Sequence, residues 1–310
     1  MLPLVTHPSY SYGFPPNHRF AMEKFALLAE QLRAAGLLRS DNLFRPSRAK
    51  LSWLERVHCP DYIERFIENR WSAREIKRCN LPWSEGLVER SLISPAGTVL
   101  TAQLALNTGI ACHLAGGTHH AHYNYASGFC VFNDLAITAK LLLEENGLDR
   151  VLIFDCDVHQ GDGTAMLLAD EPRAITCSIH AGNNFPFTKS LSDVDVALDD
   201  GVGDEAYLQV IEQTLERLLE QHKPQLVLYD AGVDIYTGDP LGRLQVSEVG
   251  IRRRDRAVLS MLYSRKIPVA TVIGGGYDDD RQALARRHAI VVEEAARLVG
   301  WPNQRVGNMT

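Results

Sequence analysis

Two residues that could bind a metal ion, Asp157 and His159, lie two positions apart, directly after an apolar run at residues 151–154. In an extended segment such side chains point to the same side, so this pair could chelate one ion. Asp234, after another apolar run, could complete a set of two carboxylates and one imidazole. Such a set leaves a coordination position open for water, as a catalytic zinc site requires. The pair alone is a weak signal, because aspartates at strand ends also cap helices and form turns.

Acid–base and hydrogen-bonding groups follow two glycine-rich segments. His119 and His120 come after Gly116-Gly117, and Tyr277 comes after the glycines at 274–276. The pKa of histidine lies near neutrality, so a histidine pair beside a metal-activated water suits removal and then donation of a proton. A phenol could donate a hydrogen bond to a developing oxyanion, and glycines let the backbone approach a ligand. The structural alternatives are a surface loop for the histidines and a turn whose tyrosine packs on the surface.

Five short apolar runs, bounded by Gly, Asp or Pro, are interpreted as the buried strands that position these groups. These strands are residues 2–6, 151–154, 174–179, 226–229 and 269–273. Helical periodicity appears between them, at residues 133–145, 204–221, 247–263 and 281–298. The alternation predicts an α/β fold with a central, mostly parallel sheet flanked by helices on both faces. Without a linker or repeat, we expect a single domain over residues 1–310, whose first part caps one edge of the sheet.

The polar clusters of the sequence follow the predicted strands. Open α/β sheets bind ligands at the carboxyl ends of their strands. Acid and imidazole groups follow the strand at 151–154, two aspartates follow 226–229, and the glycines with Tyr277 follow 269–273. Together with the histidine pair, these clusters are therefore expected to meet at one edge of the sheet.

Composition excludes several classes of function. The formal charge of −6 gives no basic field for nucleic acid, and no apolar run approaches the ~18 residues of a membrane span. The amino terminus lacks a basic leader, and the six cysteines show no C-x-x-C spacing, so we expect a soluble, cytoplasmic protein with reduced thiols. The arginine run at 252–254, with Arg256, is expected to be a solvated helix face.

The order of the motifs along the chain resembles the histone deacetylase family, over about residues 95–280. The matching segments are Gly116-Gly117-Thr118-His119-His120, Gly128-Phe129-Cys130-Val131-Phe132-Asn133-Asp134, Asp155-Cys156-Asp157-Val158-His159-Gln160-Gly161-Asp162-Gly163, Ala231-Gly232-Val233-Asp234 through Gly238-Asp239-Pro240, and Gly274-Gly275-Gly276-Tyr277. Gln160 and the short glycine run before Tyr277 are most similar to the class IV branch and its bacterial relatives.

The resemblance implies a role for each matching residue. Zinc would be held by Asp157, His159 and Asp234. His119 and His120 would be the general base and acid pair, oriented by Asp155 and Asp162, and Tyr277 would bind the substrate carbonyl. A structural potassium ion would be bound by oxygens of Asp155, Asp157, His159, Ser178 and Ile179. The substrate channel would be lined by Gly128, Phe129 and Phe185, with Arg19 near its floor.

The implied function is hydrolysis of the amide of an N-acyl-lysine, with an acetyl or fatty acyl group, by metal-activated water. Loop 183–187 would set the width of the acyl pocket. Alternatives on the same site are an acetylpolyamine or small-molecule amidohydrolase and a non-catalytic acyl-amine binding protein. The resemblance also raises a binuclear ureohydrolase, but Gly161 stands where its D-x-H-x-D motif needs a carboxylate. The aspartates at 278–280 could attract a cationic substrate or start a helix, and we favour the helix start.

Overall fold

The computed structural model describes residues 1–302, and its centre is one sheet of eight parallel strands. The strands are β1 (Leu4–Val5), β2 (Leu43–Phe44), β3 (Ile110–His113), β4 (Val151–Asp155), β5 (Ala174–Ala181), β6 (Val194–Leu198), β7 (Leu226–Asp230) and β8 (Val269–Val272). Their order across the sheet is β2-β1-β3-β8-β7-β4-β5-β6, and every neighbouring pair is parallel. The predicted parallel sheet is therefore confirmed.

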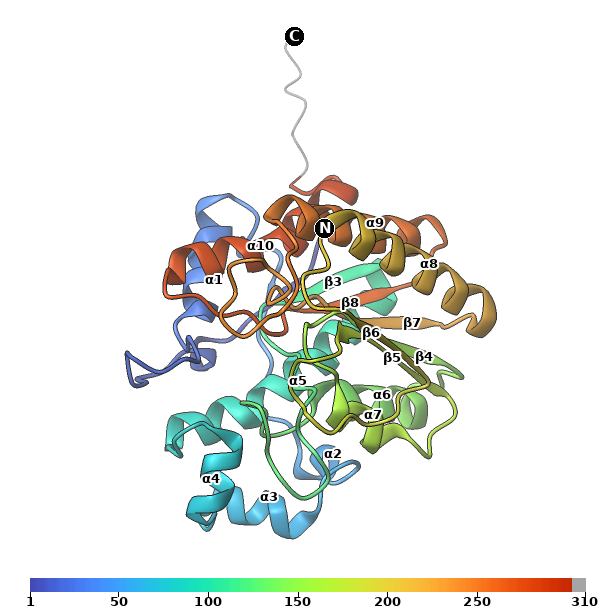
Figure 1. Ribbon diagram of the computed structural model, residues 1–310. Helices are drawn as coiled ribbons and strands as arrows, with labels where there is room; N and C mark the ends of the chain where they lie inside the picture. The colour runs from blue at the N-terminus through green and yellow to red at the C-terminus, as the bar shows by residue number, and fades with distance from the viewer. Residues whose placement is uncertain (303–310) are drawn as a thin grey trace.

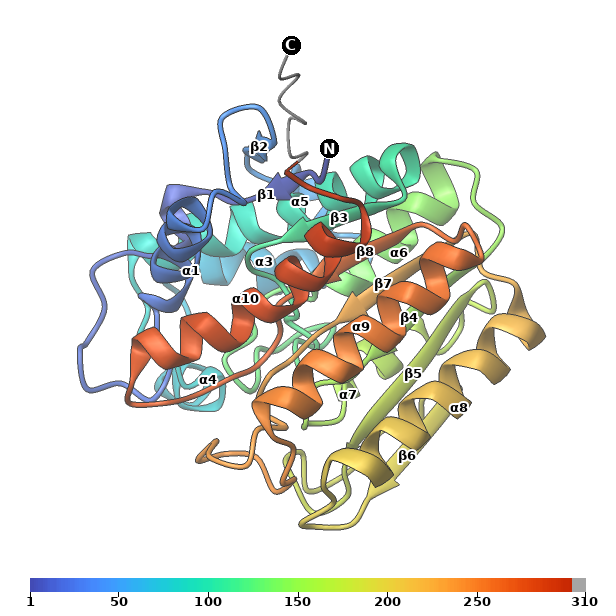
Figure 2. The same ribbon diagram turned by 90° about the horizontal axis from the view of Figure 1, so that it is seen from above.

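Helices cover both faces of this sheet (Figure 1). They are α1 (Lys24–Ala34), α2 (Leu51–Leu54), α3 (Pro60–Ile67), α4 (Ala73–Cys79), α5 (Glu85–Thr108), α6 (Asp134–Glu145), α7 (Asp162–Leu168), α8 (Asp204–His222), α9 (Glu248–Ser264) and α10 (Arg281–Leu298), with a short 3-10 helix at Pro8–Tyr10. On one face α1, α10, α9 and α8 lie side by side in this order (Figure 2), and α5, α6 and α7 lie on the other. Because both faces are covered, the central strands are buried along their whole length.

All five predicted strands and all four predicted helices are present, with no end displaced by more than two residues. The sequence did not indicate β2, β3, β6 or the long helix α5. The first part of the chain lies at one edge of the sheet, as expected, and supplies the edge strand β2 and its neighbour β1.

The arginine run on α9 is only partly a solvated face. Arg253 is exposed and pairs with Glu205, as expected. Arg254, by contrast, is fully buried, and the prediction was wrong for this residue. Its guanidinium donates to the carbonyl oxygens of Gly232 (2.6 Å) and Ala231 (3.1 Å) and to the carboxylate of Asp255 (2.9 Å). Arg254 therefore fixes the loop that follows β7.

Replacing Arg254 with methionine is expected to destabilise the protein by roughly 3–5 kcal/mol, because the buried carboxylate of Asp255 would lose its cation and two carbonyls would lose their donor. Urea unfolding measures this difference. The matched control is Arg253→Met, one position earlier on the same helix, where the exposed ion pair with Glu205 contributes about 0–1 kcal/mol. Equal unfolding midpoints for the two variants would contradict the buried role of Arg254.

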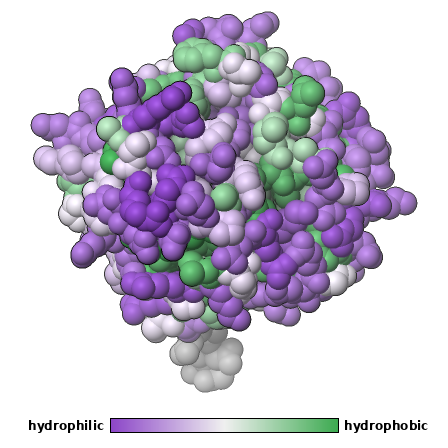
Figure 3. Space-filling view, turned by 90° about the horizontal axis from the view of Figure 1, so that it is seen from below, coloured by the Kyte–Doolittle hydropathy of each residue, from purple (hydrophilic) through white to green (hydrophobic). Residues whose placement is uncertain are grey.

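The surface of the molecule is largely hydrophilic on the face seen from below, with only small apolar patches (Figure 3). Within residues 1–302, no helix combines the length and the apolar character that crossing a membrane demands.

Candidate active site

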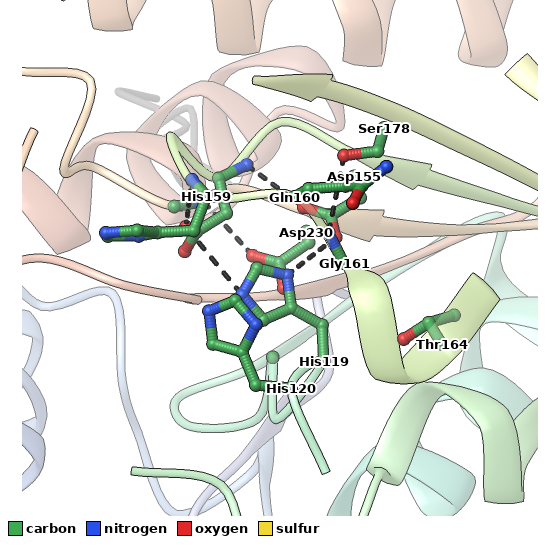
Figure 4. Close-up of polar contacts among 12 residues, drawn as sticks. His119, His120, Asp155, His159, Gln160, Gly161, Thr164, Ser178 and Asp230 are labelled. Atoms are coloured by element: carbon green, nitrogen blue, oxygen red, sulfur yellow. Dashed lines mark hydrogen bonds and ion pairs between the residues drawn. The ribbon is translucent and has the colours of Figure 1, made fainter. Parts of the chain in front are cut away.

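Four adjacent strands, β3, β8, β7 and β4, carry the predicted zinc ligands, the histidine pair and Tyr277 on the segments that follow their carboxyl ends. Asp155 and Asp230 are direct neighbours in the register of β4 and β7. The close-up in Figure 4 shows His119 and His120 beside Asp155, Asp230 and His159. The topology therefore brings together groups that are more than a hundred residues apart in the sequence.

Asp157, His159 and Asp234 form a group that could hold a metal ion, since each offers one ligand atom within 4.8 Å of the others. Nδ1 of His159 lies 3.0 Å from Oδ1 of Asp157 and 3.1 Å from Oδ2 of Asp234. Burial lowers the pKa of His159, but the two carboxylates outweigh it and raise the pKa to about 10. The site thus favours positive charge at the point where the three side chains meet, and its donors are those that zinc prefers.

Glycine is required at position 275 by the same arrangement. A Cβ atom on Gly275 would lie 2.1 Å from Oδ2 of Asp234 and 2.5 Å from Oδ2 of Asp157. The backbone N–H of Gly275 instead donates to Oδ2 of Asp157 at 2.6 Å. Gly161 is equally crowded, with a Cβ position 2.4 Å from Oδ2 of Asp155, so this position has no room for the extra carboxylate of a binuclear site.

The two adjacent histidines each have a carboxylate partner. Nδ1 of His119 lies 2.7 Å from Asp155, Nδ1 of His120 lies 2.6 Å from Asp162, and the two rings are 4.1 Å apart. Burial acts to lower the pKa of His119, but Asp155 and Asp157 hold it well above its usual value. Burial, reinforced by the neighbouring His119, lowers the pKa of His120 to about 4. The two imidazoles therefore differ, since the carboxylates favour the protonated form of His119 and burial favours the neutral form of His120.

A third histidine, His122, shares the carboxylate of Asp162 with His120. Nε2 of His122 lies 2.9 Å from the second oxygen of Asp162, and its ring stacks on Tyr125 at 4.4 Å. His122 was not predicted from the sequence. The only signal was its place two residues after the histidine pair.

Removing this contact is expected to lower kcat about tenfold with little change in KM, because Asp162 would orient His120 less firmly. The test compares His122→Leu, which removes the donor, with His122→Gln, whose amide can still donate to Asp162. Steady-state kinetics should show recovery of most of the lost rate in His122→Gln. Equal rates in the parent and His122→Leu would show that Asp162 orients His120 unaided.

Tyr277 lines the same pocket as Asp157 and His159. It is 7% exposed, and within residues 1–302 its hydroxyl has no hydrogen-bond partner. Its backbone N–H donates to Oδ2 of Asp239 at 2.7 Å, so Asp239, which received no role from the sequence, fixes the loop. Burial, reinforced by Asp234, raises the pKa of Tyr277 well above its usual value. The phenol stays protonated and can act as a donor.

A second group of possible metal ligands includes His119 and two aspartates, Asp155 and Asp230. Ligand atoms of His119, Asp155 and Asp230 also lie within 4.8 Å of one another. Asp230 is fully buried, and its Oδ2 has no partner among the described residues. Burial, with the nearby Asp155 and Asp157, raises the pKa of Asp230 well above its usual value, which favours its neutral form. The sequence placed Asp230 at the edge of the sheet but gave it no function.

Two connected pockets form the channel. Gly128, Phe129 and Tyr277 line both, and Phe185 lines the outer one, 4.9 Å from the ring of His120. Arg19 is exposed and lines the outer pocket, so its expected place near the floor was wrong.

The inner pocket instead contains two buried cations, Lys24 and Arg90. Nζ of Lys24 lies 3.4 Å from the carbonyl oxygens of Gly274 and Gly276, and burial lowers the pKa of Lys24 to about 8. The guanidinium of Arg90 lies 4.6 Å from the ring centre of Phe25. Both cations come from helices, α1 and α5, whose sequences gave no sign of the site.

Comparisons with known proteins indicate a family and a fold. The histone deacetylase domain family matches residues 18–294. An uncharacterised protein of Picosynechococcus sp. is 46% identical over 297 residues, covering 96% of this chain and 99% of that protein. Histone deacetylase clr6 of Schizosaccharomyces pombe is 32% identical, covering 87% and 70%. A crystal structure of a histone deacetylase homologue complexed with SAHA shares the fold, with a TM-score of 0.81 at 24% identity over 95% of this chain and 84% of that one.

Proposed function

Since the chain belongs to the histone deacetylase family, we propose that it is a zinc-dependent hydrolase that cleaves the amide bond of an N-acyl-lysine. One observation carries this proposal. The buried group of Asp157, His159 and Asp234 adjoins a pocket that His119, His120 and Tyr277 also line. A hydrolase of this kind needs a metal, a proton acceptor, a proton donor and an oxyanion donor at one place.

Asp157, His159 and Asp234 would hold the zinc ion. When bound, zinc polarises the substrate carbonyl and lowers the pKa of water to about 7. Backbone groups of the chain hold the carboxylates that would bind this cation. Backbone N–H groups of Gly275 and Val158 donate to the outer oxygens of Asp157 and Asp234 and keep both carboxylates in place.

The two imidazoles would move the protons. Hydrolysis removes one proton from the attacking water and delivers one to the leaving amine of lysine. Because Nδ1 of His119 and Nδ1 of His120 face Asp155 and Asp162, each ring can present Nε2 to the substrate. The carboxylates fix the ring orientation and stabilise the protonated form of each imidazole.

Tyr277 would bind the carbonyl oxygen through its hydroxyl. The negative charge on that oxygen grows as the carbonyl carbon becomes tetrahedral, so the hydrogen bond strengthens during the reaction. Phe129 lies 5.7 Å from the Tyr277 ring and, with Phe185, would enclose the lysine methylenes. These rings also exclude water from the site.

A structural potassium ion forms part of the proposal. Asp155, Asp157, His159, Ser178 and Ile179 would supply its oxygens, partly through backbone carbonyls. The register of the sheet supports this, because Asp155 on β4 and Ser178 on β5 are direct neighbours. Hard oxygen donors suit an alkali cation.

The test uses zinc-loaded protein with acetyl-lysine, decanoyl-lysine and myristoyl-lysine peptides and with acetylated polyamines. We expect release of the free acid from a lysine peptide, loss of this activity with a chelator and its return with zinc. Faster turnover of acetylpolyamines would favour the small-molecule alternative. Tight binding of all substrates without product would favour the non-catalytic alternative.

A further inference from the structure

The outer pocket is the mouth of the proposed active site. It shares five lining residues with the inner pocket: His120, Gly128, Phe129, His159 and Tyr277. A lysine side chain that enters the outer pocket can reach Tyr277, which lines both pockets. The chain on either side of that lysine therefore lies against the remaining residues of the mouth.

Those remaining residues carry four positive charges and no negative one. Arg19, Lys77, Arg78 and Arg243 line the outer pocket, and neither Asp nor Glu does. All four are exposed. Within residues 1–302, only Arg243 has a carboxylate within 4.0 Å, that of Asp200 at 3.0 Å. The mouth is thus basic, although the whole chain has a formal charge of −6.

The positive charges come from three separate segments. Lys77 and Arg78 lie in the last turn of α4, where basic residues also suit the helix dipole. That local reason does not apply to Arg19 or Arg243, which lie outside helices and more than 50 residues from α4. The Arg78 guanidinium lies 4.5 Å from the ring centre of Tyr125, which keeps its charge at the mouth.

Three aspartates near the mouth in the sequence, Asp239, Asp278 and Asp280, have other partners. Asp280 caps α10 by accepting from the N–H of Ala283, and Asp278 pairs with Arg287. The interpretation of residues 278–280 as a helix start is therefore confirmed for Asp280. Asp239 is buried and accepts from three backbone N–H groups.

We propose that the substrate lysine lies in an acidic stretch of polypeptide, with Asp or Glu on either side of the acylated residue. This inference rests on the proposed function and names its substrate class. Carboxylates flanking the lysine would approach Arg19, Lys77 and Arg78, whereas a basic peptide or a polyamine would bring like charges together. Complementary charge of this kind raises association rates and excludes wrong partners.

The test uses three acetyl-lysine peptides of equal length, whose flanking residues are all Glu, all Ser or all Lys. At low salt, kcat/KM should be about tenfold higher for the Glu peptide than for the Lys peptide. At about 0.5 M salt the ratio should fall to within about twofold, because screening then acts within a few ångströms. A ratio near one at low salt would overturn the proposal.

The triple variant Arg19→Glu, Lys77→Glu and Arg78→Glu should reverse the preference. Arg243 is left unchanged because Asp200 already pairs with it. The matched control is Arg39→Glu, Lys50→Glu and Lys223→Glu, three exposed cations that line neither pocket. The control makes the same change in net charge, and it should keep the preference for the Glu peptide. Loss of preference in the control would point to overall charge rather than to the mouth.

Binding separates this inference from the hydrolase proposal. Fluorescence anisotropy with labelled peptides and the Tyr277→Phe variant measures affinity without turnover. If the Glu peptide binds most tightly but the parent hydrolyses no peptide, the hydrolase proposal is contradicted and the proposal of an acidic partner is supported. If all three peptides bind with equal affinity and are hydrolysed at equal rates, the hydrolase proposal is supported and the proposal of an acidic partner is contradicted.

Discussion

Replacing Tyr277 with phenylalanine is expected to lower kcat by about 100- to 1,000-fold. The change removes only the hydroxyl, which has no partner within residues 1–302 and lies at a surface shared by both pockets. The backbone contact of Tyr277 with Asp239 does not depend on the hydroxyl, so the loop should keep its place. The lost donor acts mainly on the oxyanion, and KM should therefore change much less than kcat.

Steady-state kinetics with an acetyl-lysine peptide measures this effect, together with the zinc content and the unfolding midpoint. Tyr263→Phe is the matched control, because Tyr263 is 46% exposed on α9 and lines neither pocket. The control should retain the parent rate. A folded, zinc-loaded Tyr277→Phe protein with the parent kcat would rule out the oxyanion role of this phenol.

The parts of the fold that the sequence predicted are those with an uninterrupted local pattern. Strands β4 and β7 are buried along their length and rich in apolar residues up to a final aspartate, because helices cover both faces. Strand β6 lies at the edge and is only half buried on alternate residues, so it gave no apolar run. Helix α5 is buried on nearly every side, so its sequence lacks the periodicity of an amphipathic helix. It also contains Pro95, a residue that usually argues against a helix.

Strand β3 was missed because its last residue is a buried histidine. His113 can be buried there because both ring nitrogens have hydrogen-bond partners from other parts of the sequence. Nε2 lies 2.7 Å from the hydroxyl of Tyr10, and Nδ1 lies 3.0 Å from that of Thr98. A single sequence does not show such partners. The polar network, rather than local apolarity, explains why this segment can be a central strand.

The residues of the site likewise divide into those that a local sequence pattern indicates and those that only tertiary packing brings there. Asp157, His159 and Tyr277 were predictable because they directly follow strands, and parallel strands end at one edge. Lys24 and Arg90 reach the inner pocket from helices α1 and α5, through tertiary packing that no local spacing reports. Arg254 was assigned to the surface because its neighbours in the sequence are also charged.

Changing Asp157 to asparagine is expected to abolish zinc retention and, with it, nearly all hydrolysis. Asparagine keeps the size of the side chain, but its amide nitrogen cannot accept, so one of the two backbone N–H groups that donate to Asp157, those of Gly275 and His159, loses its acceptor. It removes one of the two negative charges that face Nδ1 of His159, and zinc prefers a carboxylate to a neutral amide here. The purified parent should hold ~1 zinc per chain and the variant less than ~0.1.

Elemental analysis after gel filtration measures this directly, and His159→Ala should give the same loss by removing the imidazole. Asp170→Ala is the matched control, because Asp170 is exposed and lies outside both pockets. Zinc bound elsewhere on the chain would persist in Asp157→Asn and His159→Ala alike. Full zinc content in a folded Asp157→Asn protein would therefore show that the ion is not held between Asp157, His159 and Asp234, and the hydrolase proposal would lose its metal site.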